Sequence, residues 1–106
     1  MAMSEQTPTE AANGLPVQLK FTTSGTENEA TQINLGSVDH ATKVSVRFDT
    51  DDGKVAWESS SDTIASAFFG CDADSTYQWT LNRAKPVSAM YVASATATVT
   101  VTLTFE

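Results

Sequence analysis

The eleven residues before the C-terminal glutamate constrain the fold of this chain more than any other segment. Small or apolar residues occupy every odd position from Ala95 to Phe105, and serine or threonine occupies the even positions from Ser94 to Thr104. This two-residue repeat is typical of a β-strand with one face in a core and the other towards solvent. Because strands usually have ~3 to 10 residues, we expect a bend near Ser94 that separates this strand from another at Val87–Ala93.

Shorter alternations of the same kind recur through the chain and predict further strands. They lie at residues 17–21, 33–35, 44–48, 55–57 and 77–81. The run Asp49–Gly53 is a turn signal, and it predicts a β-hairpin between the strands at 44–48 and 55–57. Residues 59–74 allow two interpretations. The favoured interpretation is a helical turn capped by Ser61 or Asp62 and ended by Gly70. The alternative is a short strand, because periodicity cannot distinguish a strand from a helix in so short a segment.

The composition supports a fold made of strands. Threonine occurs 16 times and serine 11 times among 106 residues, and β-branched threonine suits a pleated, half-exposed surface. We expect an all-β fold, an antiparallel β-sandwich of immunoglobulin-like or small jelly-roll type, with about seven strands and one short helix near residues 62–69. Residues 1–13 lack periodic apolar residues and predict a flexible N-terminal arm; residues 14–106 predict a single sandwich domain.

The charge balance excludes several classes of partner. Thirteen acidic and six basic residues give a net charge of −7, which argues against binding to nucleic acid or to an anionic membrane. One cysteine cannot close an internal disulfide, and one histidine cannot supply a multi-histidine metal site. We therefore expect no enzymatic activity and no cofactor.

Two sets of polar residues are the remaining candidates for chemistry. His40 and Cys71 could form a base and a nucleophile, but Asp72 and Asp74 near the thiol would raise its pKa, so a structural role is favoured. Asp49, Asp51 and Asp52 are a weak calcium candidate, because a hard cation takes several closely spaced oxygens. Their spacing does not match the helix-flanked calcium loop, so solvated carboxylates in a turn are the favoured interpretation.

Four aromatic residues could form a platform on which sugars stack. They are Trp57, Tyr77, Trp79 and Tyr91. Each lies on the apolar side of its own alternation, which favours packing in the core. An exposed Trp79 would indicate a ligand-stacking surface instead.

The C-terminal region resembles the last strand of chaperone–usher pilins and related fimbrial domains. The resemblance lies in the alternation from Ala95 to Thr104 with the penultimate aromatic Phe105, and in the early stretch Ile33–Gly36. It implies an immunoglobulin-like sandwich. Pilins donate an N-terminal extension with alternating apolar residues to a neighbouring subunit, and residues 4–13 of this chain have no such row.

These observations favour a role in contact between proteins. The expected function is a structural or interaction module of virion type, such as a phage head-decoration protein, that attaches to a larger shell or fibre as a homo-oligomer or part of an assembly. Arm residues Thr7, Pro8 and Thr9 are candidate partner contacts. The sequence shows no signal peptide, so we expect synthesis in the cytoplasm and a place in the virion. The alternative is a secreted fimbrial or adhesive subunit on the extracellular surface whose signal has been removed.

Overall fold

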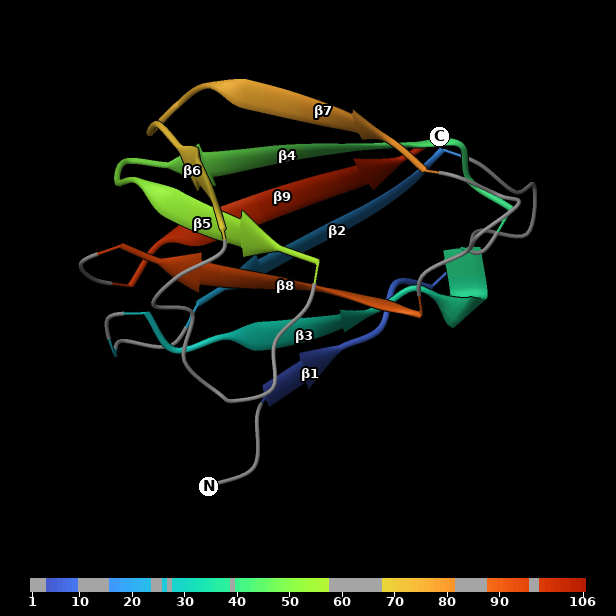
Figure 1. The fold of residues 1–106 in the computed structure, drawn as a ribbon, viewed down its shortest axis with the longest axis horizontal. Helices are drawn as coiled ribbons and strands as arrows, with labels where there is room; N and C mark the ends of the chain where they lie inside the picture. The colour runs from blue at the N-terminus through green and yellow to red at the C-terminus, as the bar shows by residue number, and fades with distance from the viewer. Residues whose placement is uncertain are drawn as a thin grey trace.

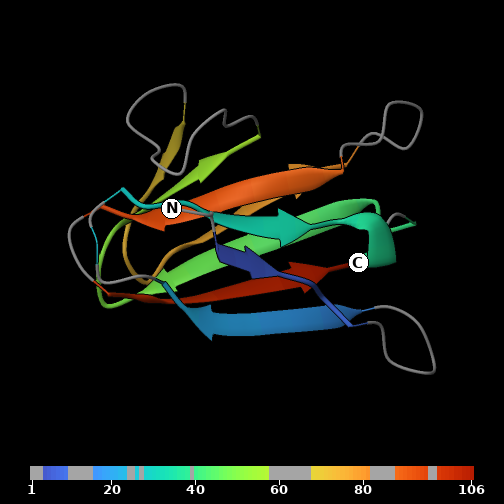
Figure 2. The same ribbon diagram turned by 90° about the horizontal axis from the view of Figure 1, so that it is seen from below.

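The computed structural model describes residues 4–9, 16–23, 26, 28–38, 40–57, 68–81, 88–95 and 98–106. Within these ranges the chain forms nine strands and one short 3-10 helix, η1 (Gly36–Val38). The strands form two sheets that face each other across one core (Figure 1 and Figure 2), which confirms the expected all-β sandwich. The strands are β1 (Ser4–Gln6), β2 (Val17–Thr22), β3 (Thr31–Asn34), β4 (Lys43–Asp49), β5 (Gly53–Ala56), β6 (Phe69–Cys71), β7 (Thr76–Thr80), β8 (Ala89–Ser94) and β9 (Thr100–Phe105).

The strand order makes the sandwich a jelly roll. One sheet has the order β1-β3-β8-β5-β6 and the other β2-β9-β4-β7. Eight strands form four nested antiparallel pairs: β2 with β9, β3 with β8, β4 with β7 and β5 with β6. The chain is wound so that β4 also pairs with β9 and β5 also pairs with β8. An immunoglobulin sandwich pairs three sets of consecutive strands, whereas β5 and β6 are the only consecutive strands that pair in the described part of this chain.

The predicted hairpin between the strands at 44–48 and 55–57 is wrong. β4 and β5 follow each other in the chain, but β4 lies between β9 and β7 while β5 lies between β8 and β6. The loop between them therefore crosses from one sheet to the other, and Thr50 within it has a φ of 71°, a conformation that β-branched residues rarely adopt. Alternation reports which face of a strand is buried, but it does not report which strand lies beside it.

The N-terminal arm is not unpaired throughout. Ser4–Gln6 forms β1, which pairs parallel with β3 at the edge of the five-stranded sheet, with Glu5 opposite Gln32. The sequence does not predict this strand, because Ser-Glu-Gln has no apolar residue and its side chains are exposed or half-buried. Pairing there depends on the backbone and on polar side chains.

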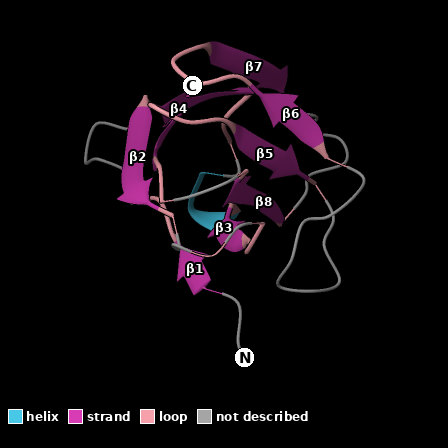
Figure 3. Cartoon of the chain, turned by 90° about the vertical axis from the view of Figure 1, so that its left-hand side faces the viewer, coloured by secondary structure: helices cyan, strands magenta, loops and turns pink. Residues whose placement is uncertain are grey.

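The core lies between the two sheets and is filled from alternate positions of the strands. In β9, Val101, Leu103 and Phe105 are fully buried while the intervening threonines are half-buried on the outer face, as the alternation predicted. Viewed end-on, the two sheets curve around this core (Figure 3). β8 ends at Ser94, a chain bend follows at Ala95, and β9 is a separate strand, as expected.

The helix expected near residues 62–69 lies almost entirely outside the described residues. The exceptions are Phe68, which has no regular structure, and Phe69, which begins β6. Among the described residues, no helix has the length and apolar character needed to cross a membrane.

Candidate functional site

The edge of the five-stranded sheet, where the N-terminal arm binds, is the candidate functional site. We call it the arm site, and it is formed by Glu5, Thr7, Pro8, Gln32, Asn34 and Ser37. Its framework is β3, whose Ile33 faces the core while Gln32 and Asn34 point to the outer face. The polar positions of one strand thus present amide groups to the arm.

Side-chain hydrogen bonds hold the arm on this edge. The Asn34 Nδ2 group donates to Thr7 Oγ1 at 3.0 Å and to Glu5 Oε1 at 3.3 Å. Gln32 Nε2 donates to the same Glu5 oxygen at 3.4 Å, and the Ser37 hydroxyl donates to the Pro8 carbonyl oxygen. Pro8 is buried and Thr9 is exposed. Two of the three predicted arm contacts, Thr7 and Pro8, therefore bind the chain's own sheet edge.

These contacts hold the arm weakly. Three of the four side-chain bonds are exposed to solvent, and an intramolecular hydrogen bond contributes only about 0.5–1.5 kcal/mol net. Ordering each arm residue costs about 1–2 kcal/mol of backbone entropy, and Pro8 is the only described arm residue that is buried. The side-chain bonds alone therefore do not exceed this entropy cost, and the backbone pairing of β1 with β3 is also needed to hold the arm.

His40 and Cys71 are not brought together. His40 lies just before β4, whereas Cys71 is paired with Gly53, which follows β4. The seven residues of β4 span roughly 23 Å at about 3.3 Å each. The two side chains lie towards opposite ends of the sandwich, and this pair cannot act as nucleophile and base.

The Cys71 thiol is buried and its chemistry is suppressed. Burial, with a smaller contribution from the negative charge of Asp72, raises the pKa of Cys71 from 9.0 to about 11. The sequence correctly predicted the direction of the Asp72 effect. Because the thiolate is the nucleophile, the thiol is unreactive at neutral pH.

We expect iodoacetamide to alkylate Cys71 at pH 8 roughly 100-fold more slowly in the native chain than in the chain unfolded in guanidinium chloride. The reason is the thiolate fraction, which falls about tenfold for each unit by which the pKa exceeds the pH. Mass spectrometry of timed samples measures both rates. Equal rates in the native and unfolded chains would contradict a buried, protonated thiol.

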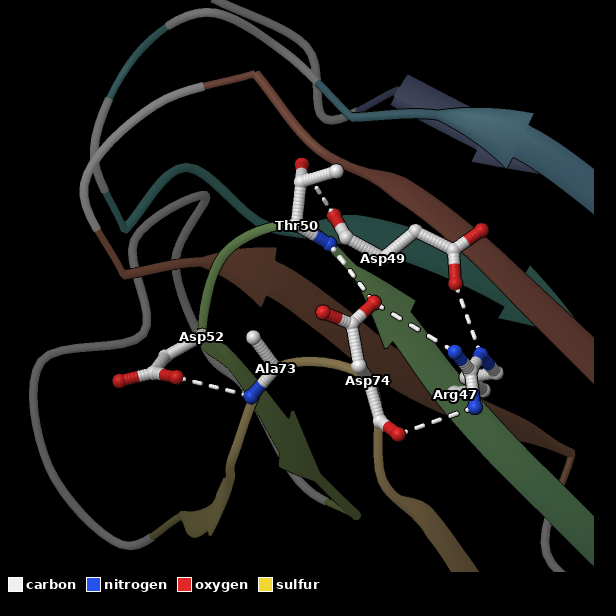
Figure 4. A network of polar contacts seen from close by, with 6 residues as sticks. All are labelled: Arg47, Asp49, Thr50, Asp52, Ala73 and Asp74. Atoms are coloured by element: carbon white, nitrogen blue, oxygen red, sulfur yellow. Dashed lines mark hydrogen bonds and ion pairs between the residues drawn. The ribbon is translucent and has the colours of Figure 1, made fainter.

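Asp49, Asp51 and Asp52 of the calcium candidate act as hydrogen-bond acceptors, and Figure 4 draws the contacts of Asp49 and Asp52. Asp49 accepts from Arg47 Nε at 2.8 Å, and Asp52 Oδ1 accepts from the backbone N–H of Ala73 at 2.8 Å. Asp51 Oδ1 accepts from the N–H of Asp52. Among the described residues, no three His, Cys, Asp or Glu side chains gather as a metal site requires.

These contacts connect two loops at one end of the sandwich. Asp74, in the turn between β6 and β7, accepts at Oδ1 from the backbone N–H of Thr50 at 3.1 Å and from Arg47 Nη2 at 3.4 Å. Its carbonyl oxygen accepts from Arg47 Nη1 at 3.0 Å. The bonds fasten the β4–β5 crossover to the β6–β7 turn and hold Thr50 in its left-handed conformation. The arrangement indicates a structural brace, with Arg47 as a member that the sequence did not single out.

Three of the four candidate aromatic residues pack against the core and one does not. Trp57, Tyr77 and Trp79 are half-buried at the rim of the core. The Trp79 ring lies 6.1 Å from Trp57 and 6.4 Å from Tyr77 between centroids. Tyr91 instead packs on a separate cluster of Ala30, Ala56 and Ala93. Its assignment to the core side is wrong, because β8 carries apolar residues on both faces and alternation cannot choose between them.

The outer face of the four-stranded sheet carries a polar groove of about 380 Å³. Thr102 lies at its centre, and the strand register places Lys20 on one side of it and Arg47 on the other. The side chains lining this groove include hydroxyl, amide and charged groups. The face is solvated, as the hydroxylated positions of the alternation predicted.

Comparisons with known proteins give this chain no relatives. No family model, no curated protein and no solved structure matches it.

The residues of the arm site that the sequence missed are Glu5, Gln32, Asn34 and Ser37. The one signal available was polar side chains at alternate positions of a short strand, which is equally typical of an ordinary solvated surface.

Proposed function

We propose that this chain is a non-enzymatic structural and interaction module, of the virion type exemplified by phage head-decoration proteins, that attaches to a larger protein shell or fibre. The observation that carries the proposal is the arm site, where an N-terminal strand is added to a sheet edge through weak polar contacts. The arm of a neighbouring subunit could make the same contacts. The jelly roll, which viral capsid domains also use, supports the proposal by analogy of fold alone.

Exchange of the arm between copies tests the proposal. Thr7 Oγ1 and Asn34 Nδ2 lie 3.0 Å apart, so cysteines at these two positions should be close enough to form a disulfide. We expect full-length Thr7→Cys and Asn34→Cys chains to form a mixed disulfide dimer when they are combined under mild oxidation. The dimer is measured on a non-reducing gel.

The control is Thr9→Cys combined with Asn34→Cys, because exposed Thr9 lies beyond the described contacts. Native Cys71 is buried and should not form a disulfide under these conditions. If the Thr7 and Asn34 variants form no more mixed dimer than this control, the arm does not exchange and the proposal loses its basis. Neighbouring genes separate the lead from its alternative: a capsid gene supports the virion role, and an usher gene supports the fimbrial one.

A further inference from the structure

The four edge strands of the two sheets differ in how well they are protected from pairing with another chain. Exposed edges are usually protected by charge, proline or short length. β1 carries Glu5, β2 carries Lys20 at its centre, and β6 has three residues. β7 has five residues, Thr-Tyr-Gln-Trp-Thr, with no charge, proline or glycine. Among the described strands, β7 is therefore the unprotected edge.

The free edge of β7 presents backbone groups from known residues. The N–H of Leu81 donates to the Thr42 carbonyl oxygen at 2.7 Å, so the backbone N–H of Leu81 points towards the β4 side of the strand. Antiparallel strands alternate between residues that bond to the partner and residues that point away. The N–H and C=O groups of Thr76, Gln78 and Thr80 therefore point away from β4, and no other strand of the described part pairs with β7 (Figure 1).

We propose that β7 pairs antiparallel with β7 of a second copy, about a two-fold axis that passes beside Gln78. Of the registers that place outward-pointing residues opposite each other, this one alone uses all five residues of the strand. It places Gln78 opposite Gln78 of the second copy, and Thr76 opposite Thr80. An antiparallel pair of identical strands has the two-fold symmetry of the commonest soluble dimers, and the four-stranded sheet would continue across both copies.

The aromatic residues beside this edge favour the same occupant. In the proposed register Tyr77 lies opposite Trp79 of the second copy, on the core side of the sheet, as a non-hydrogen-bonded pair whose side chains approach closely. Cross-strand aromatic pairs stabilise a sheet. Phe69 is 53% exposed and its ring lies 5.8 Å from that of Trp79. Two half-covered aromatic clusters would thus become one.

The charge distribution permits the pairing despite the net charge of −7. Asp74, the nearest described acidic residue, lies before β7, so an antiparallel pair places the two Asp74 residues beyond opposite ends. Eight residue steps separate them in this register, roughly 26 Å at about 3.3 Å a step. That distance exceeds the Debye length of about 8 Å at physiological ionic strength. The uncharged strand is where two acidic copies can meet without close repulsion.

A charge at the two-fold axis tests the proposal. Gln78→Lys places two ammonium groups directly opposite each other, while the exposed side chain leaves the core of each copy untouched. We expect sedimentation velocity to show a dimer for the wild type, and a dissociation constant roughly fivefold or more higher for Gln78→Lys. Gln18→Lys is the matched control, because Gln18 is exposed on β2 of the same sheet and should leave the dimer unchanged. Circular dichroism confirms the fold of each variant.

A disulfide tests the register. Cα atoms of a hydrogen-bonded antiparallel pair lie about 5.5 Å apart, within disulfide range. Gln78→Cys should therefore form a covalent dimer on mild oxidation, whereas Thr80→Cys should not, because Thr80 faces Thr76 of the second copy. A monomeric wild type at all concentrations, a dimer that Gln78→Lys leaves unchanged, or equal cross-linking of both cysteine variants would overturn the proposal. The arm site lies on the other sheet, so deletion of residues 1–9 should leave this dimer intact, and the two proposals can fail separately.

Discussion

Gly53→Ala should lower the free energy of unfolding by about 3 kcal/mol, because there is no room for a methyl group at this position. A Cβ atom on Gly53 would lie 2.2 Å from two ring carbons of Phe48. The Phe48 ring is fully buried in the core, and overpacking a dense core typically costs about 1–3 kcal/mol or occasionally more. The melting temperature should fall by roughly 15 °C for a domain of this size. Urea titration and calorimetry measure the two quantities.

Gly70→Ala is the matched control for this substitution. Gly70 lies in β6, next to β5 in the same sheet, and a Cβ atom there would meet nothing within 4 Å. It should therefore change stability little. The double variant Phe48→Leu with Gly53→Ala should recover part of the loss, since a smaller side chain leaves space. If Gly53→Ala and Gly70→Ala were equally harmless, the close approach of Phe48 to Gly53 would be absent in solution.

This contact also explains why the β4–β5 connection could not be inferred from the sequence. Phe48 is near the end of β4 and Gly53 begins β5, and the ring takes the place of a side chain where the chain turns from one sheet into the other. The intervening Asp and Thr residues are equally suited to a hairpin turn. The distinction depends on the fit of one ring against one glycine and on the brace from Asp74 to Thr50, which are contacts between distant parts of the chain.

The strands themselves could be predicted because most of them bury a single face. In β2, β4 and β9 every second residue faces the core and those between are polar or exposed, so the period of two locates each strand to within a few residues. The same reasoning fails for β8, where Tyr91 and Ala93 form an apolar surface on the second face. It also fails for β1, whose three residues are all polar.

The candidate sites were less predictable because they depend on which strands lie at the edges. Thr7 and Pro8 were identified as contact residues, but their binding partners Asn34 and Ser37 are about thirty positions away in the sequence. The uncharged run of β7 can be read from the sequence, but it indicates a site for pairing with another chain only because the sheet order places β7 at an edge. An interior strand with the same residues would carry no implication for assembly.

Val101→Asp should unfold the domain at 25 °C, whereas Thr102→Asp should change its stability by less than about 0.5 kcal/mol. Val101 is fully buried, with Phe21 and Phe48 as its neighbours on the flanking strands, so an aspartate there would be a buried charge without a partner. Such a charge costs several kcal/mol, a large part of the 5–15 kcal/mol that holds a typical domain together.

Thr102 is the matched position for this comparison because it is the next residue of the same strand and faces the outer groove. Its cross-strand neighbours are Lys20 and Arg47, whose positive charges would attract the new carboxylate. Thr100 is less suitable, because it lies opposite the negatively charged Asp49. Far-ultraviolet circular dichroism during urea titration gives the stability of both variants. Equal damage from the two substitutions would mean that β9 is covered on both faces, and a stable Val101→Asp chain would mean that the core does not lie where the alternation from Ala95 to Phe105 places it.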